Sequence, residues 1–395
     1  MILLATAQLI NLIRNRMKFV VSSSALLKQL SAINGVITSN PVVPILENFL
    51  CDIQNGTLKV TASDLQTTVM TELEVDTQEK GSIAVPARIL IDTLKNLPEQ
   101  PVTFSVDEST YTVEIQSANG RYRLSGENAT DFPKVPMVED GHEVEMPSDV
   151  LANAVSNTIF ATSTDELRPA MTGVYVNLNG ADSTFVATDG HRLIRYRRDD
   201  IGSGSKSPII IPRKALTLLR SVLPAENVSV SVKFNASNAF FKFAGASGGN
   251  IQMVCRLIDE RYPDYENVIP QDNTNTMTVN RATLLSSLKR IAIYANKTTH
   301  QVRLKVADNQ LHVSAEDIDF SNEANETLEC EHPGEEIEIG FNARFLIEML
   351  SNLDTKDVVF KFSQPNRAGL IEPSVKEDHE DVLMLVMPVM LNNYV

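Results

Sequence analysis

The feature that most constrains the fold of this chain is an internal repeat. A run of β-branched and apolar residues leads into an acidic residue at Asp64, Asp189 and Asp317, so the copies lie 125 and 128 residues apart. Each copy follows a polar turn and therefore predicts the second strand of a β-hairpin. Recurrence over this distance indicates a structural unit that is built three times along the 395 residues.

Two amphipathic helices are predicted in each third of the chain. Each helix follows the end of a predicted strand, begins at a residue suited to a helix start and carries apolar residues at helical spacing. The six windows are 22–33, 86–97, 148–160, 212–223, 280–293 and 342–353. Elements that recur in the same order favour an α+β chain of three similar domains over a chance likeness of short segments.

Polar stretches with Pro and Gly near residues 139–142 and 270–275 are the expected domain boundaries. The predicted domains are therefore 17–141, 142–271 and 272–395. Residues 1–16 are apolar and precede a second methionine, but their basic residues follow the apolar run and no small-residue cleavage site comes after it. The run is also too short to span a bilayer, so we expect a disordered or helical extension and no membrane association.

Charge is distributed unevenly along the chain. The formal net charge is −15, which argues against a protein that grips nucleic acid over its whole surface. The six helix windows hold ten basic and three acidic residues, a net of +7, so the remainder carries −15 − 7 = −22. The basic residues are Lys28, Arg88, Lys95, Arg213, Lys214, Arg220, Arg281, Lys289, Arg290 and Arg344. Lys and Arg are good helix formers, but so is Glu, which occurs once in these windows. The pattern favours a basic helical face for phosphate contacts that carry no sequence information.

Cysteine and histidine usage points away from metals and disulfides. Cys51, Cys255 and Cys330 are far apart and odd in number, so they predict neither a disulfide framework nor a metal site. The six histidines are scattered without the spacing of a helical metal site. We expect a cytoplasmic protein without a metal or other cofactor.

The stretch Asp189-Gly190-His191-Arg192 has the residue types of an active site. The other two copies of the repeat keep the acidic residue but lack the His-Arg pair. No GxSxG elbow of a serine nucleophile lies beside this stretch, and the chain lacks the Gly-rich GxGxxG and GxxxxGK[ST] loops that bind phosphates. We therefore expect no catalytic residue here, and a stretch that holds a partner.

Four motifs together resemble one family. ATDGHRL (187–193), DERYPDYENVIP (259–270), PVVPIL (41–46) and VMPVML (386–391) resemble the bacterial DNA polymerase III β subunit, the sliding clamp, from Met17 to about Leu391. The resemblance implies three domains of two βαβββ units each. Two chains would close head to tail into a ring, with helices lining the hole and sheets outside. The implied function is non-catalytic: the ring encircles duplex DNA regardless of sequence and tethers the polymerase for processive replication. A peptide-binding repeat protein that does not encircle DNA is the alternative.

The resemblance also implies a hydrophobic peptide-binding pocket. Its partners would be the replicative DNA polymerase, the clamp loader and repair proteins, each presenting a short segment with Gln followed by Leu and Phe. The residues carried over are Arg168, Met171, Thr188, Gly190, His191, Arg192, Leu193, Pro263, Val268, Ala368, Leu385, Met387, Pro388, Val389 and Leu391. Met390, Asn267 and Ala170 depart from the family pattern, and Asn392–Val395 extend beyond it, so the preference for residues flanking the peptide motif is open.

Further residues are implied for DNA and for the dimer. Arg88, Arg213 and Lys214 lie at or near the starts of two predicted helices and match DNA-contacting positions. The implied dimer interface pairs the edge of the first domain with that of the third, and its residues are Tyr122, Leu124, Ile293 and Tyr294. Candidate ion pairs across it join Arg121 or Arg123 to Glu323 or Glu326.

Overall fold

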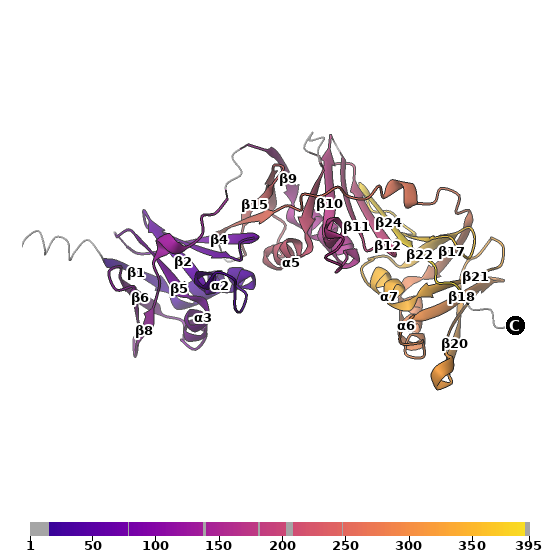
Figure 1. Ribbon diagram of the computed structural model, residues 1–395, viewed down its shortest axis with the longest axis horizontal. Coiled ribbons are helices and arrows are strands. Elements are labelled where there is room, and N and C mark those ends of the chain that lie inside the picture. Colours follow the sequence, from indigo (N-terminus) through magenta and orange to yellow (C-terminus); the bar gives the residue numbers. More distant parts are fainter. Residues whose placement is uncertain are drawn as a thin grey trace, which may run out of the picture. The chain divides into compact units, whose positions relative to one another are not determined.

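The computed structural model (Figure 1) describes residues 16–77, 79–136, 140–180, 182–202, 208–246 and 248–391. The expectations for residues 1–15 and for Asn392–Val395 lie outside the described residues. The contacts divide the chain into two compact units. The first holds the described residues up to 152 together with 214–257, and the second holds 153–213 together with the residues from 258 onward.

Each third of the chain contains two βαβββ units in succession, as predicted. The first third consists of β1 (Arg16–Ser22), α2 (Ser23–Ile33), β2 (Asn48–Gln54), β3 (Thr57–Ser63), β4 (Thr67–Glu74), β5 (Gly81–Pro86), α3 (Ala87–Lys95), β6 (Pro101–Asp107), β7 (Thr112–Gln116) and β8 (Arg121–Ser125). The second consists of β9 (His142–Pro147), α4 (Ser148–Thr158), β10 (Gly173–Asn179), β11 (Asp182–Thr188), β12 (Arg192–Arg198), β13 (Ile209–Pro212), α5 (Arg213–Val222), β14 (Ser229–Phe234), β15 (Asn238–Ala244) and β16 (Asn250–Arg256). The last consists of β17 (Asn275–Asn280), α6 (Arg281–Ile291), β18 (Gln301–Ala307), β19 (Gln310–Asp317), β20 (Asn322–Glu329), β21 (Ile337–Asn342), α7 (Ala343–Ser351), β22 (Asp357–Phe362), β23 (Gly369–Pro373) and β24 (Glu380–Val386). The six α-helices of the described residues lie within the predicted windows.

Each compact unit contains one four-stranded and one eight-stranded antiparallel sheet. In the first unit the strand orders are β1-β6-β7-β8 and β5-β2-β3-β4-β16-β15-β14-β9. In the second unit they are β20-β19-β18-β21 and β13-β10-β11-β12-β24-β23-β22-β17. The predicted hairpins are confirmed, because β3, β11 and β19 pair with the strand before them. Both eight-stranded sheets join two thirds of the chain through the last strands of their βαβββ units, β4 with β16 and β12 with β24.

Burial follows the two periodicities that the sequence carries. In β6, Val102, Phe104 and Val106 are buried at alternate positions, and Phe104 stacks on Phe19 of β1 with ring centroids 4.7 Å apart. In α2 the side chains of Leu26 and Leu30 lie one turn apart and are buried. Each such large apolar side chain contributes about 1.5–3 kcal/mol by leaving water. The core of the first third therefore lies between its helices and its sheets.

Two helices begin at the asparagines that the sequence indicated. The Asn280 side chain accepts a hydrogen bond from the Thr283 N–H at 3.0 Å, and the Asn342 side chain accepts one from the Arg344 N–H at 2.9 Å. Each bond satisfies one of the amide donors that a helix leaves open at its first turn. No helix in the described part of the chain is long and apolar enough to cross a membrane.

Cys51 and Cys255 are expected to resist alkylation until the protein unfolds. Both thiols are free and buried, and burial raises the pKa of each to about 12. Because the thiolate is the nucleophile, neither side chain should react with iodoacetamide at pH 8 in the folded protein. Mass spectrometry after a timed pulse measures this, and the same pulse in denaturant provides the control. Rapid modification of either cysteine in the folded chain would contradict the burial.

Candidate functional site

The Asp189-Gly190-His191-Arg192 stretch is the turn between β11 and β12. Asp189 Oδ1 accepts hydrogen bonds from the N–H groups of His191 at 2.9 Å and Arg192 at 3.0 Å. Gly190 has a φ of +90°, which an L side chain rarely adopts. At the first copy of the repeat, Asp64 caps the turn between β3 and β4 in the same way, through the N–H groups of Gln66 and Thr67. The carboxylate of Asp189 therefore shapes a turn.

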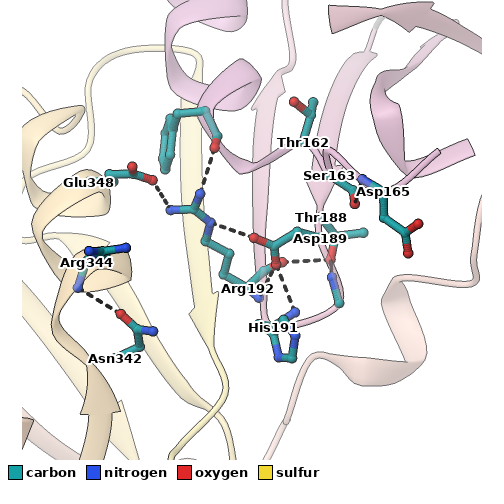
Figure 2. Close-up of polar contacts among 12 residues, drawn as sticks. Thr162, Ser163, Asp165, Thr188, Asp189, His191, Arg192, Asn342, Arg344 and Glu348 are labelled. Carbon is teal, nitrogen blue, oxygen red and sulfur yellow. Dashed lines mark hydrogen bonds and ion pairs between the residues drawn. The ribbon is translucent and has the colours of Figure 1, made fainter. Parts of the chain in front are cut away.

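Arg192 is buried, with 7% of its side chain exposed, and its guanidinium has partners on three sides (Figure 2). Nε donates to Asp189 Oδ2 at 3.1 Å, Nη1 donates to Glu348 of α7, and Nη2 donates to the Phe160 carbonyl at 2.8 Å. The guanidinium also lies 4.7 Å from the ring centroid of Phe345 and 5.4 Å from that of Phe160. Arg192 thus ties the turn to α7 and to the 3₁₀ helix η4 (Ile159–Ala161).

His191 is exposed and is held by its backbone. Its N–H is bound to Asp189, and its carbonyl accepts the N–H of Met387 at 2.8 Å. Its ring stacks against Phe345 of α7 at a centroid distance of 6.2 Å. Because the carboxylate of Asp189 is taken up by the turn and by Arg192, it does not orient the imidazole as a catalytic base would require.

A buried hydrophobic cluster lies beneath this turn. Three of the residues predicted for the pocket, Leu193, Ala368 and Leu385, belong to it, and Leu193 faces Leu385 across β12 and β24. Its other buried members are Val186, Ile210, Tyr262, Ile269, Leu370 and Leu383. Partly buried Ala170, Tyr175, Ile258 and Tyr265 pack against it. The structure thus brings together segments that are almost 200 residues apart in sequence.

The tyrosines of the cluster were missed from the sequence as site residues. Tyr262 donates from its hydroxyl to the Val186 carbonyl at 3.3 Å, and its ring lies 5.1 Å from that of Tyr175. Burial raises the pKa of the Tyr262 hydroxyl, and burial together with Glu266 raises that of Tyr175. The available signal was the pair of aromatic residues, Tyr262 and Tyr265, within the DERYPDYENVIP motif.

Three segments that adjoin residues of the cluster in sequence carry exposed side chains, and we call these side chains the rim. Val268, 56% exposed, lies within the DERYPDYENVIP motif at the end of the 3₁₀ helix η6 (Glu266–Val268), five residues after half-buried Pro263. Met387, 44% exposed, comes directly after β24. Arg168 pairs with Asp165 at 2.8 Å, and its guanidinium lies over Gly190, where an added Cβ would meet Nη1 at 2.8 Å.

Other predicted pocket residues lie nearby in different roles. Met171 is half-buried in the 3₁₀ helix η5 (Pro169–Thr172), and the buried hydroxyl of Thr188 donates to the Arg192 carbonyl at 2.7 Å. Pro388 is half-buried beyond Met387. The last two predicted residues lie against β21: the N–H of Val389 donates to the Gly340 carbonyl at 2.8 Å, and Leu391 covers the space that a Gly340 side chain would fill.

The residues predicted to contact DNA lie in the first turns of α3 and α5. Arg88, Arg213 and Lys214 are all exposed. Lys214 forms an ion pair with Asp64, which the sequence did not indicate. Among the other basic helix residues, Arg290 pairs with Glu326, and Arg281 donates to the carbonyls of Thr355 and Leu350. Part of the basic charge on the helices is therefore balanced locally.

The residues predicted for the dimer interface differ in exposure. Tyr122, Ile293 and Tyr294 are 36%, 65% and 43% exposed, whereas Leu124 is 9% exposed and packs within its own sheet. Arg121 and Glu326 each have an ion-pair partner in the same chain, Glu114 and Arg290 respectively. Arg123 and Glu323 are exposed. Among the described residues, no group of three His, Cys, Asp or Glu could hold a metal ion.

The tandem βαβββ fold, with an active-site-like stretch that forms a structural turn, defines a protein built from repeats. Family models of the DNA polymerase III beta subunit match almost the whole described chain: the N-terminal domain at residues 17–136, the central domain at 145–264 and the C-terminal domain at 266–388. The chain belongs to this family, that of the beta sliding clamps, which are processivity factors and not enzymes.

Individual relatives agree with the family models. The beta sliding clamp of Proteus mirabilis is 30% identical over 343 residues, which is 87% of this chain and 92% of the relative. That of Escherichia coli K12 is 29% identical over 93% of this chain and 99% of the relative. Among solved structures, the Bacillus subtilis DNA polymerase sliding clamp has a TM-score of 0.89 at 26% identity. The Pseudomonas aeruginosa sliding clamp bound to griselimycin has a TM-score of 0.88 at 28% identity. Both alignments cover 95% of this chain and 100% of the other.

Proposed function

We propose that two copies of this sliding clamp close head to tail into a ring around duplex DNA and hold the replicative DNA polymerase on it. The main support for a ring of two copies is the way in which the thirds of the chain are joined. Last strands of βαβββ units pair at both internal junctions, β4 with β16 and β12 with β24. The strands β8 and β20 are also last strands of βαβββ units, but each lies at the edge of its four-stranded sheet. Pairing of the same kind would therefore join β20 to β8. A second copy supplies the missing strand at each end.

Charge supports this pairing. At the internal junction β12 and β24 carry opposite charges, with Arg195 and Asp381 paired at 2.8 Å. The strand β8 reads RYRLS with two arginines, and β20 reads NEANETLE with three glutamates. Exposed strand edges invite pairing, and opposite charges across them fix which edge is chosen.

The basic helices supply the contacts to DNA in this proposal. Arg88, Arg213 and Lys214 would meet phosphates without reading bases, which allows the ring to slide. Lys214 would contact a phosphate while it remains in its ion pair with Asp64. Linkage by encirclement, and not tight binding, then gives processivity, in keeping with the acidic balance of the whole chain.

The turn between β11 and β12, the hydrophobic cluster and its rim form the proposed docking site for partner peptides. Apolar side chains with a few placed polar groups suit a short Gln-Leu-Phe type segment from the polymerase, the clamp loader or a repair protein. The exposed methionine at the rim can adapt to different flanking residues. The related Pseudomonas aeruginosa clamp, with griselimycin bound, shows that a clamp of this fold takes up a ligand.

The ring is tested by the topology of the DNA that it holds. The protein is loaded onto nicked circular DNA by a clamp loader, separated from free protein by gel filtration, and followed after the circle is cut. We expect retention on the circle and loss within minutes of linearisation, because a closed ring leaves only over an end. Blocking both ends with bound protein should restore retention. Equal retention on open linear and circular DNA would contradict encirclement.

A further inference from the structure

The second helix of each third begins at an equivalent place in the repeat. The sequences VPARIL, IPRKAL and FNARFL align Arg88 with Lys214 and Arg344, and Ile89 with Ala215 and Phe345. Each helix follows the first strand of its βαβββ unit: α3 follows β5, α5 follows β13, and α7 follows β21. What α5 and α7 touch in the chain therefore indicates what α3 is built to touch.

At both internal junctions this helix start contacts the preceding third, either at the repeated acidic residue or at the turn that follows it. In the first compact unit, Lys214 of α5 pairs with Asp64 itself. In the second, the ring of Phe345 of α7 lies against His191 and against the guanidinium of Arg192, both from the turn after Asp189. The contact is ionic in one case and mainly aromatic in the other.

The corresponding turn of the last third follows Asp317 and differs from the other two. Strand β20 begins five residues after its acidic residue, whereas β4 and β12 begin three residues after theirs. This longer turn contains the 3₁₀ helix η7 (Ile318–Phe320), in which Asp319 lies between two exposed apolar residues: Ile318 is 61% exposed and Phe320 is 71% exposed. Ile89, at the start of α3, is also 53% exposed. Isolated exposed apolar residues are common, but these two sets occupy the equivalent sides of one junction.

We propose that Ile89 of one copy docks between Ile318 and Phe320 of a second copy, so that an apolar contact of helix α3 with η7 fixes the junction between copies. This inference rests on the proposed two-copy ring and adds the residues that determine its closure. The contact of α3 with η7 of a second copy would then be equivalent to the contacts that α5 and α7 make with the preceding third within one chain.

The charges around η7 and around the start of α3 favour a second copy of the chain as the partner that binds at η7. Beside η7 lies an open cavity of about 590 Å³ whose lining includes Ile318, Glu316, Asp319 and Glu323. The three carboxylates outweigh one lining cation, Arg303, which already pairs with Glu338. The start of α3 presents a cation, Arg88, directly before Ile89. The site is also continuous with the edge strand β20, which the proposed ring pairs with β8.

Disulfide trapping tests the contact directly. The three native cysteines are buried and free, so introduced thiols can be read separately. A chain carrying both Ile89→Cys and Phe320→Cys should form a covalent dimer on mild oxidation, whereas Ile89→Cys with Val375→Cys should not. Val375 is 70% exposed and serves as the matched control. The same oxidation is applied to a chain that carries Ile89→Cys and Ile318→Cys. If both variants form the dimer but neither forms the cross-link, the proposal is overturned.

The dissociation constant of the dimer gives the second readout. Because a ring has two junctions, Ile89→Asp should raise the constant about a hundredfold, or about tenfold per junction. Phe320→Asp should act similarly, while Val375→Asp should leave it within about twofold. Sedimentation measures the constant and circular dichroism checks the fold. An unchanged constant for Ile89→Asp and Phe320→Asp overturns the α3–η7 contact alone, and a chain that stays monomeric at every concentration overturns the two-copy ring with it.

Discussion

Replacing Arg192 by alanine is expected to destabilise the second compact unit by about 3 kcal/mol. The side chain is 7% exposed and lies between two aromatic rings, with Asp189, Glu348 and the Phe160 carbonyl as its polar partners. Its loss leaves the Phe160 carbonyl without this donor and opens a gap between Phe160 and Phe345. Glu348 is 51% exposed and can turn to water, which keeps the cost below that of a fully buried pair.

The measurement must resolve one unit from the other, because a chain with two compact units has no single free energy of unfolding. Hydrogen exchange of the β12 and β24 amides, followed by mass spectrometry, reports the second unit directly. Arg197→Ala is the matched control: Arg197 lies on the same strand and pairs with Glu266 at 3.3 Å, but the two side chains are 42% and 64% exposed. It should cost less than about 1 kcal/mol. Equal protection in the two variants would contradict a structural role for Arg192.

The repeat made most of the fold predictable. The features that depend on local sequence were predicted. They are the strands with a period of two, the helix starts at Asn280 and Asn342, and the hairpins before Asp64, Asp189 and Asp317. The pairing of β4 with β16 and of β12 with β24 was not predicted from the residues, because strands joined across thirds carry no turn between them that would fix their register.

The candidate site was less predictable because its contacts are distant in sequence. Arg192 reaches Phe160 over 32 residues and Glu348 over 156, so no spacing rule reveals that its guanidinium points inward. The Lys214 ion pair with Asp64 spans 150 residues. Comparison of the three copies did identify the acidic residue as structural, because it recurs where the His-Arg pair does not.

Aspartate at either Val268 or Met387 is expected to raise the dissociation constant of a Gln-Leu-Phe peptide about thirtyfold, or about 2 kcal/mol. The two residues come from η6 and from the segment after β24, and both are exposed at the rim of the hydrophobic cluster. A carboxylate there would have to be desolvated when leucine and phenylalanine side chains bind. Fluorescence polarisation with a labelled peptide measures the constant.

Val375→Asp places the same charge on an exposed apolar residue outside this rim, and it should leave peptide affinity unchanged. His191→Ala separates the imidazole from the backbone, since the carbonyl that accepts the Met387 N–H is retained. If the peptide packs against the imidazole, affinity falls in this variant too, while sedimentation shows an unaltered dimer. Full affinity in the Val268, Met387 and His191 variants together would contradict docking of the peptide at this site.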